Sequence, residues 1–210
     1  LLEVTYGNGT FVTVGYRYLG NERHTGTILT SLDGINWTKK NYETDTLRRI
    51  TYENGLFVAV GSEGAIVTSS DGDLWTLRNS AGWFSATSEN FSVTYGNGLF
   101  VTVGWDKTVL TSPDGITWTN KGSSIARRQG DIYIDDGPNF REVTYDNGLF
   151  VAVGGERAIF TSSDGDSWTL RNFMPWKRDL LMQLTLNGVT YVNGLFVTVG
   201  QSRTILTSPD

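Results

Sequence analysis

A twelve-residue segment recurs along the chain and constrains the fold more than any other feature of the sequence. It is written VTYGNGLFVTVG at residues 93–104 and VTYVNGLFVTVG at residues 189–200. Five copies begin, with spacings of 46, 43, 50 and 46 residues, at Val4, Ile50, Val93, Val143 and Val189. A sheet as small as one repeat cannot bury both of its faces alone, so the repeats are expected to stack on one another.

Each repeat is predicted to contain four short strands. The first ends in Val-Thr-Tyr and leads into an Xaa-Asn-Gly turn, which supplies the two positive-φ positions of a tight hairpin. The second, such as Leu56 to Gly61, is almost continuously apolar, which is typical of a strand covered on both faces. The third is Thr-Ile-Leu-Thr-Ser at residues 27–31 and its variants, and the fourth begins at a Trp. A period in the forties with this content predicts an all-β fold, a β-propeller of four-stranded antiparallel blades with five repeats.

The repeats are interpreted as one propeller domain, residues 1–210, with an incomplete last blade. The predicted blades cover residues 1–46, 47–89, 90–139, 140–185 and 186–210. The fifth repeat reaches Asp210 inside its last turn and lacks its fourth strand. The simplest inference is that the natural chain continues past Asp210 into more blades. The rival explanations are a five-bladed ring with a three-stranded last blade and an edge completed by another chain. The last of these allows self-association, because an unpaired strand edge invites strand addition.

The turn between the third and fourth strands carries the most specific motif. It reads SLDGINW at residues 31–37, SSDGDLW at 69–75, SPDGITW at 112–118 and SSDGDSW at 162–168. This turn resembles the Asp-box, or BNR, repeat of sialidase-like β-propellers, and the resemblance extends over all five repeats. The family pattern is Ser-x-Asp-x-Gly-x-Thr-Trp, whereas here Gly follows Asp directly and Trp comes one residue sooner. The resemblance implies a non-catalytic member of that superfamily.

The Asp and Trp of this motif are interpreted as scaffold. A short Asp side chain accepts hydrogen bonds from backbone N–H groups two residues on, Gly takes the positive φ of the bend, and Trp packs over the hairpin. In the family these boxes are structural and lie on the blade periphery. One carboxylate per box falls short of the six or more oxygens that Ca²⁺ usually takes, so no metal is predicted. The predicted structural residues are Asp33, Trp37, Asp71, Trp75, Asp114, Trp118, Asp164 and Trp168.

Composition argues against several classes of partner. The chain has 17 Lys and Arg against 22 Asp and Glu, and a net charge of -5 disfavours nucleic acid, which requires a basic surface. No run of eighteen apolar residues occurs, so membrane insertion is not expected. The chain has no Cys, which excludes disulfides and thiolate metal sites, and no cofactor is predicted. Repeats rich in Thr, Gly, Asn and Trp favour an extracellular or cell-surface location.

Function is expected on the loops that differ among the repeats, because binding residues concentrate on variable loops held by a rigid scaffold. In a four-stranded blade, the second-to-third turns and the blade connections share one face of the ring. Aromatic rings beside cations on this face suit a glycan or a protein surface. The candidate ligand-binding residues are Trp83, Trp105, Arg127, Arg128, Tyr133, Trp176 and Arg178. Trp83 and Trp176 are equally expected to fill gaps between blades instead of binding a ligand, because large buried aromatic side chains are also common in cores.

Catalysis is not expected. His24 is the one His of the chain and is interpreted as a solvated loop residue, so a His-dependent triad is excluded. The Arg-Ile-Pro motif of sialidases does not occur. A carboxylate pair among Asp131, Asp135, Asp136 and Glu142 keeps a glycoside hydrolase as one alternative. The other alternative is an assembly or scaffold role, resembling that of the propellers that help to build photosystem II, in which an Arg-rich face docks a protein partner.

Overall fold

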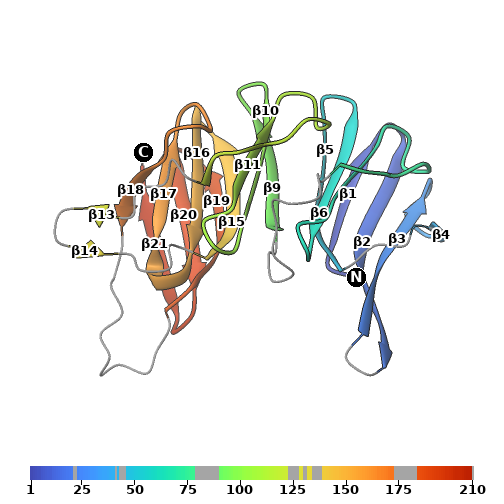
Figure 1. Cartoon of the computed structure of the whole chain (residues 1–210), viewed down its shortest axis with the longest axis horizontal. Coiled ribbons are helices and arrows are strands. Elements are labelled where there is room, and N and C mark those ends of the chain that lie inside the picture. The colour runs from blue at the N-terminus through green and yellow to red at the C-terminus, as the bar shows by residue number, and fades with distance from the viewer. Residues whose placement is uncertain are drawn as a thin grey trace. The chain divides into compact units, whose positions relative to one another are not determined.

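The computed structural model describes residues 1–20, 23–40, 42, 46–78, 90–122, 128–129, 132–133, 139–172 and 184–209. These residues form strands, turns and the 3₁₀ turn η2 (Gly155–Arg157), and contain no α-helix (Figure 1). They include four antiparallel sheets of four strands, one sheet of three strands and a two-stranded ribbon. The predicted all-β fold, with a last blade of three strands, is confirmed. A helix long and apolar enough to cross a membrane is absent from the described part of the chain.

Each of the five sheets is formed by one repeat, and we call these sheets blades 1 to 5. Strands that follow one another in the sequence are paired, so every blade is a meander. Blade 1 contains β1 (Glu3–Gly7), β2 (Thr10–Gly20), β3 (Arg23–Ser31) and β4 (Thr38–Lys40). Blade 2 contains β5 (Leu47–Glu53), β6 (Leu56–Gly61), β7 (Ile66–Ser69) and β8 (Thr76–Leu77). Blade 3 contains β9 (Asn90–Gly96), β10 (Leu99–Gly104), β11 (Val109–Ser112) and β12 (Thr119–Asn120).

The remaining strands lie in the second half of the chain. Blade 4 contains β15 (Phe140–Asp146), β16 (Leu149–Gly154), β17 (Ile159–Ser162) and β18 (Thr169–Asn172). Blade 5 contains β19 (Leu186–Val192), β20 (Leu195–Gly200) and β21 (Thr204–Ser208). The ribbon, which the sequence did not predict, pairs β13 (Arg128–Gln129) with β14 (Ile132–Tyr133).

A tight hairpin joins the first two strands of every blade at its Asn-Gly pair. In blade 2, Asn54 and Gly55 have φ values of 52° and 75°, and the same two positions are left-handed in the other four blades. This is the backbone that a two-residue turn requires when it must match the twist of the strands it connects. The turn sets the register, placing Glu53 opposite Leu56, and thereby decides which side chains of the second strand point to each face.

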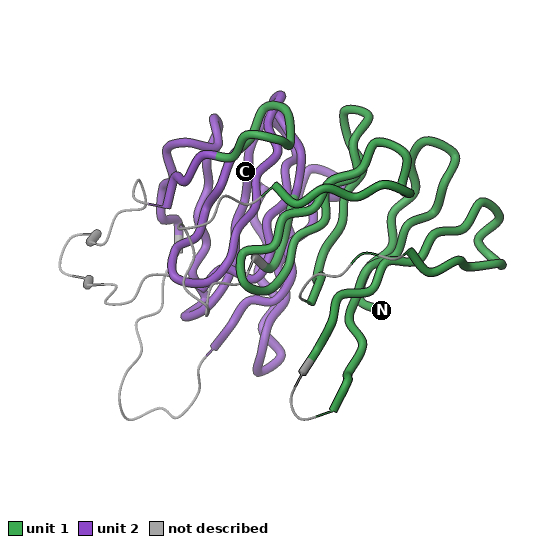
Figure 2. Tube along the Cα trace, turned by 45° about the vertical axis from the view of Figure 1, so that its right-hand side comes forward, with its two compact units in different colours: residues 1–93, 112–118 green, residues 94–111, 119–210 purple. Residues whose placement is uncertain are grey.

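The described residues cluster into two compact units (Figure 2). The first comprises residues 1–93 and 112–118, and the second comprises residues 94–111 and 119–210. In the first unit the core lies between blades 1 and 2. There Val12 and Val14 of β2 pack with Phe57 of β6, and all three are fully buried.

In the second unit, blade 4 is buried on both faces. One face packs with Val101 and Val103 of β10 through Phe150 and Phe160, which are fully buried. The other face packs with blade 5, where Leu186 and Phe196 are buried. Because β16 faces a neighbour on both sides, its sequence is apolar at almost every position rather than alternating.

Strand boundaries differ from the sequence prediction at two places. The fourth strands begin one residue after the Trp, as at Thr38, because the Trp still belongs to the turn. The third strand of blade 1 was predicted to begin at residue 27, with His24 in the preceding loop, and this prediction was wrong: β2 continues to Gly20 and β3 begins at Arg23. Alternating Tyr16 and Tyr18 give this segment strand propensity and lengthen the hairpin.

Candidate functional site

The repeated turns lie at one end of their blades. In the first unit, the Asn8 side chain in the first-to-second turn of blade 1 donates to the carbonyl of Ser70 in the box turn of blade 2, at 3.3 Å. In the second unit, Asn97 donates to the carbonyl of Ser163 in the same way, at 3.2 Å. We call this the box end. Its contacts recur between successive blades, so they belong to the stacking of the repeat.

Each box turn is closed by hydrogen bonds to its aspartate. In blade 4, Oδ1 of Asp164 accepts bonds from the backbone N–H groups of Asp166 and Ser167, both at 2.8 Å. The Ser162 hydroxyl donates to the same oxygen at 2.9 Å and accepts a bond from the Gly165 N–H at 2.8 Å. The same three bonds to aspartate occur at Asp33, Asp71 and Asp114.

These bonds lower the pKa of the box aspartates. At Asp164 the backbone N–H of Ser167 is the largest cause, followed by that of Asp166, because both stabilise the charged carboxylate. At Asp33 the backbone N–H of Asn36 is the largest cause and the Asn36 side-chain amide is the next. The carboxylates are therefore ionised at neutral pH and are engaged within their own turns.

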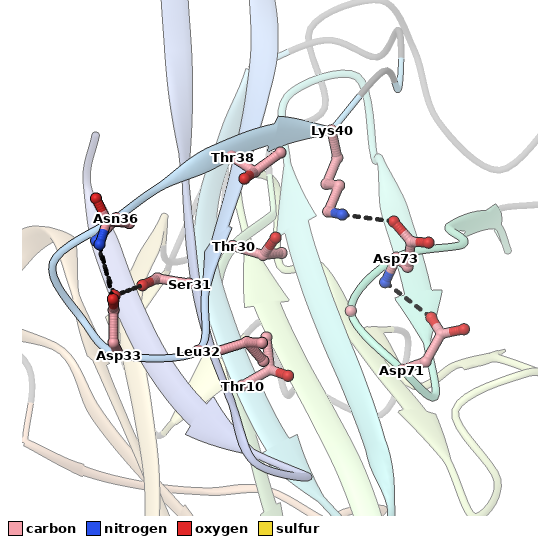
Figure 3. Close-up of a pocket in the computed structure, with 11 residues that line it drawn as sticks. Thr10, Thr30, Ser31, Leu32, Asp33, Asn36, Thr38, Lys40, Asp71 and Asp73 are labelled. Atoms are coloured by element: carbon pink, nitrogen blue, oxygen red, sulfur yellow. Dashed lines mark hydrogen bonds and ion pairs between the residues drawn. The ribbon is translucent and has the colours of Figure 1, made fainter.

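A cavity of about 470 Å³ lies at the box end between the turns of blades 1 and 2 (Figure 3). Its walls are half polar and half apolar and include Asp71 and Asp73 from one turn and Asp33 from the other. Lys40 of β4 enters this cavity and bonds Asp73 at 2.6 Å. In the second unit Lys121 bonds Asp166 at 2.8 Å, at the corresponding positions of blades 3 and 4. The recurrence of the pair indicates a blade-to-blade contact, so we do not assign a ligand site here.

At the opposite end, which we call the variable end, the second-to-third turns lie beside the connections between blades. The Ser62 N–H donates to the carbonyl of Thr46 at 2.9 Å, and the Gly155 N–H donates to that of Asn139 at 3.1 Å. The approach is so close that a Cβ on Gly154 would overlap the Asn139 carbonyl oxygen. Glycine therefore ends the second strand because the chain passes against it.

Four short turns at the variable end hold paired residues in the left-handed backbone region. Their φ values lie between 50° and 69°, a region that costs a residue with a side chain about 1–2 kcal/mol relative to the right-handed one. Three of the four pairs contain no glycine. These pairs, which we call the tip pairs, are Glu63–Gly64, Asp106–Lys107, Glu156–Arg157 and Ser202–Arg203.

The tip pairs carry charge in a conformation that glycine would adopt more readily. Two of them place an acid directly before a base, at Asp106–Lys107 and Glu156–Arg157. The Arg157 side chain donates to the Thr204 hydroxyl of blade 5 at 2.9 Å, so this tip reaches the next blade. Strained backbone of this kind clusters at binding and switch sites, which makes the tip pairs candidates for contact with a partner.

The β2–β3 hairpin adds an aromatic surface to the variable end of the first unit. Tyr18 lies opposite His24, and Tyr16 lies two residues earlier on the same face of the ribbon. The His24 ring is 5.0 Å from the Tyr16 ring and 5.3 Å from the Tyr18 ring, measured between centroids. Tyr16 is 43% exposed and Tyr18 is 59% exposed, so both rings present a face to solvent. The sequence prediction treated His24 as a solvated loop residue and did not select the two tyrosines, although their alternation with Arg17 was a readable strand signal.

Of the candidate ligand-binding residues, Trp105 is the one whose side chain is described. It is half-buried at the start of the turn that carries Asp106 and Lys107, and its carbonyl accepts a bond from the Thr108 N–H at 3.0 Å. The backbones of Arg128 and Tyr133 are paired across the β13–β14 ribbon. The others, Trp83, Arg127, Trp176 and Arg178, lie outside the described residues.

Of the four carboxylates that could form a catalytic pair, the structure describes one. Glu142 lies in β15 of blade 4, whereas Asp131, Asp135 and Asp136 lie outside the described residues. Among the described residues, no group of three or more His, Cys, Asp or Glu side chains is placed to hold a metal ion. The geometry therefore offers aromatic and charged contact surfaces at the variable end.

Comparisons with known proteins bear on the fold. No protein-family model matches the chain, and no curated protein matches it in sequence. Among solved structures, YCF48 bound to D1 peptide is similar with a TM-score of 0.61 and 14% identity, over 99% of this chain and 62% of that chain. A putative glycosidase from Bacteroides thetaiotaomicron is similar with a TM-score of 0.50 and 15% identity, over 97% of this chain and 84% of that chain.

A third similar structure is the computationally designed Ika8 protein, with a TM-score of 0.62 and 10% identity over 97% of this chain and 56% of that chain. The chain thus spans less than two thirds of the YCF48 and Ika8 chains. At these identities the likeness concerns the fold alone. Together with the five repeated sheets, it shows that this chain has the β-propeller fold.

Proposed function

We propose that the chain is a non-catalytic recognition module that binds a protein surface through its variable end. The observation that carries this proposal is the set of tip pairs, which hold charged side chains in backbone conformations that favour glycine. Because acids and bases alternate at the tips, they match a partner that carries both signs of charge, as a protein surface does. The peptide bound to YCF48 supports the idea that a propeller of this kind can hold a polypeptide.

The hairpin surface of Tyr16, Tyr18 and His24 supports the same proposal. Tyrosine offers a large contact area with few rotatable bonds and is enriched at interfaces for that reason. Exposed ring faces also suit sugars, so glycan binding is the second candidate function. An extracellular or cell-surface location is part of the proposal and depends on composition alone.

Catalysis is not part of the proposal. The glycosidase similarity supports a hydrolase only at the level of fold, and one fold hosts many functions. Release of nitrophenol from a panel of nitrophenyl glycosides tests this alternative. Turnover that disappears in Asp135→Asn or Asp136→Asn would replace the binding proposal with an enzymatic one.

The binding proposal is tested with a displayed library of random peptides and with a glycan array, each probed with the purified chain. The decisive variant is Asp106→Gly/Lys107→Gly, which keeps the left-handed backbone and removes both charges. We expect selected peptides to bind this variant at least about tenfold more weakly, while its stability is unchanged or raised because glycine relieves the strain.

A second variant and a matched control locate the surface. Tyr16→Ser/Tyr18→Ser is expected to weaken binding without loss of fold, because both rings are exposed. The control Leu32→Ser/Ile35→Ser removes two exposed apolar side chains at the box end of the same blade. Leu32 is 81% exposed and Ile35 is 80% exposed, and this variant is expected to bind as the wild type does. Binding that depends on Leu32 and Ile35 instead of the tips would contradict the proposal. Glycans bound in place of peptides would establish the second candidate.

A further inference from the structure

Asparagine followed by glycine occurs at the first-to-second turn of every blade, and this pair can undergo a reaction that the proposed function does not involve. The backbone nitrogen of the glycine attacks the side-chain carbonyl carbon of the asparagine. A C–N bond forms, and the proton of the glycine N–H leaves with the side-chain amide as ammonia. Water then opens the succinimide ring to aspartate or isoaspartate. The net reaction consumes one water and releases one ammonia, so it needs no oxidant and no cofactor.

The turns of blades 1, 2 and 3 are matched in backbone geometry and in access to water. The asparagine φ values are 47°, 52° and 48°, and the glycine φ values are 75°, 75° and 76°. All three pairs are exposed, and a Cβ on any of the three glycines would have open space around it. The pairs are Asn8–Gly9, Asn54–Gly55 and Asn97–Gly98. Asn147 and Asn193 have no complete box turn beside them among the described residues, so they offer no matched case.

The side-chain amides of the three asparagines differ in their contacts. The amide of Asn8 donates to the Ser70 carbonyl at 3.3 Å, and the amide of Asn97 donates to the Ser163 carbonyl at 3.2 Å. In both cases the acceptor is the second residue of the box in the next blade. The Asn54 side chain makes no hydrogen bond within the part of the chain that the structure describes, although the box turn of blade 3 lies in the same compact unit.

The bonds of Asn8 and Asn97 oppose closure of the succinimide ring. For the ring to close, the side chain must rotate until its carbonyl carbon approaches the glycine nitrogen. This rotation removes the amide N–H from the carbonyl of the neighbouring blade. Because a hydrogen bond within a protein contributes a modest net free energy, its loss in the transition state is expected to slow the reaction by about three- to tenfold. Asn54 has no such bond to break.

We propose that, among the Asn-Gly turns of blades 1 to 3, Asn54–Gly55 is a site of covalent modification at which the native chain deamidates first. Asn8 and Asn97 are protected by their bonds to the next blade. The same interaction that stacks two blades thus shields a reactive pair, and the one turn without it reacts.

The modification alters the hairpin that sets the register of blade 2. The aspartate product adds a negative charge at the box end. The isoaspartate product adds one methylene group to the main chain between Glu53 and Leu56, which lie opposite each other across the turn. A two-residue turn has no room for a longer main chain without a change of turn type, so this product disturbs the pairing of β5 with β6.

Peptide mapping by mass spectrometry on the intact chain tests the proposal. The chain is incubated in a mildly alkaline buffer and digested with trypsin at intervals. Deamidation is followed by the mass increase that accompanies replacement of NH2 by OH. The three turns fall on separate tryptic peptides, at residues 1–17, 50–78 and 79–107, and fragmentation locates the modified residue. Asn54 is expected to convert at least about threefold faster than Asn8 and Asn97 in the native chain.

Two controls separate structure from sequence. In guanidinium chloride the blade-to-blade bonds are lost, so the three Asn-Gly pairs are expected to convert at similar rates. Asn54→Asp keeps a residue that tolerates the left-handed backbone, and its peptide is expected to show no further mass increase, because Asn54 is the one asparagine of residues 50–78.

Three results would overturn the proposal. The first is an equal rate at the three turns of the native chain. The second is a lead of Asn54 that is the same in guanidinium chloride, because the neighbouring Glu53 side chain would then account for it. The third is the absence of conversion at Asn54 in the native chain over a period in which the unfolded chain converts.

Discussion

At the scale of single residues, the charged carboxylate of each box aspartate holds its own turn together by hydrogen bonds. Each carboxylate accepts two backbone N–H bonds and one serine hydroxyl bond, and these bonds lower its pKa. A folded-state pKa below the unfolded value means that the carboxylate stabilises the fold at neutral pH. That contribution is present above the unfolded pKa of about 3.9 and is lost as the pH falls below it.

We therefore expect Asp164→Ala to lower the free energy of unfolding by about 1–2 kcal/mol at pH 7, because two backbone N–H groups and one hydroxyl lose their acceptor. The difference from wild type should shrink as the pH falls below about 4. Urea denaturation at a series of pH values measures both effects. Asp166→Ala is the control, since the Asp166 side chain is 57% exposed and its pair with Lys121 should contribute less than about 1 kcal/mol. A difference that stays constant down to pH 2 would contradict the assignment.

At the scale of elements, the box Trp makes the same local turn in blades 1 to 4 but is not equally buried in them. Its indole N–H bonds the carbonyl of the box glycine in blades 1 to 4, at 3.0–3.2 Å, so the local turn is the same. Burial differs, because Trp168 packs in the core between blades 3 and 4 at 5% exposure, whereas Trp37 is 39% exposed. Packing between neighbouring blades therefore decides how much each Trp contributes.

Trp168→Ala is expected to lower the free energy of unfolding by about 3 kcal/mol or more, and Trp37→Ala by about 1 kcal/mol. The reason is that the first substitution leaves a cavity between two sheets and the second removes a ring that is partly in water. Chemical denaturation of the two variants gives the comparison. Equal losses would show that the local turn, and not the stacking of blades, accounts for the contribution of the Trp.

At the scale of the whole molecule, the described residues cluster into two compact units, and within each unit neighbouring blades pack against one another. In such arrays stability is approximately a sum over repeats and the interfaces between neighbours. Phe150 lies in the core of the second unit, and Phe57 occupies the corresponding position in the first. Both are fully buried, so they form a matched pair.

Phe150→Ala is expected to reduce amide protection in β10 and in β15 to β18, and to leave β1 to β7 little changed. Phe57→Ala should give the reverse pattern. Hydrogen exchange followed by mass spectrometry, with protection measured peptide by peptide, distinguishes the two patterns. A uniform loss of protection along the chain in both variants would mean that the two units unfold as one.

The sequence by itself determined the local structure of this protein. Asn-Gly at the first turn and Asp-Gly at the box are chemistry that acts within a few residues, and the apolar second strands indicate that both faces are covered. Strand order, the tight Asn-Gly hairpins and the three strands of the fifth repeat followed from the repeat alone. The ligand-binding candidates were selected as aromatic and cationic residues of the variable loops, and Trp105 is the one of them whose side chain the structure describes.

Tertiary structure decided what no local pattern encodes. It lengthened β2 and β3 so that Tyr16, Tyr18 and His24 gather on one exposed face, and it placed charged residues in left-handed turns at the variable end. It also forms a cavity of about 210 Å³ between blades 4 and 5, whose two walls come from strands that are far apart in the sequence. The physical reason is the distance along the sequence over which each feature is decided. Turns depend on residues next to one another, whereas burial, strain and cavities depend on which sheets pack together.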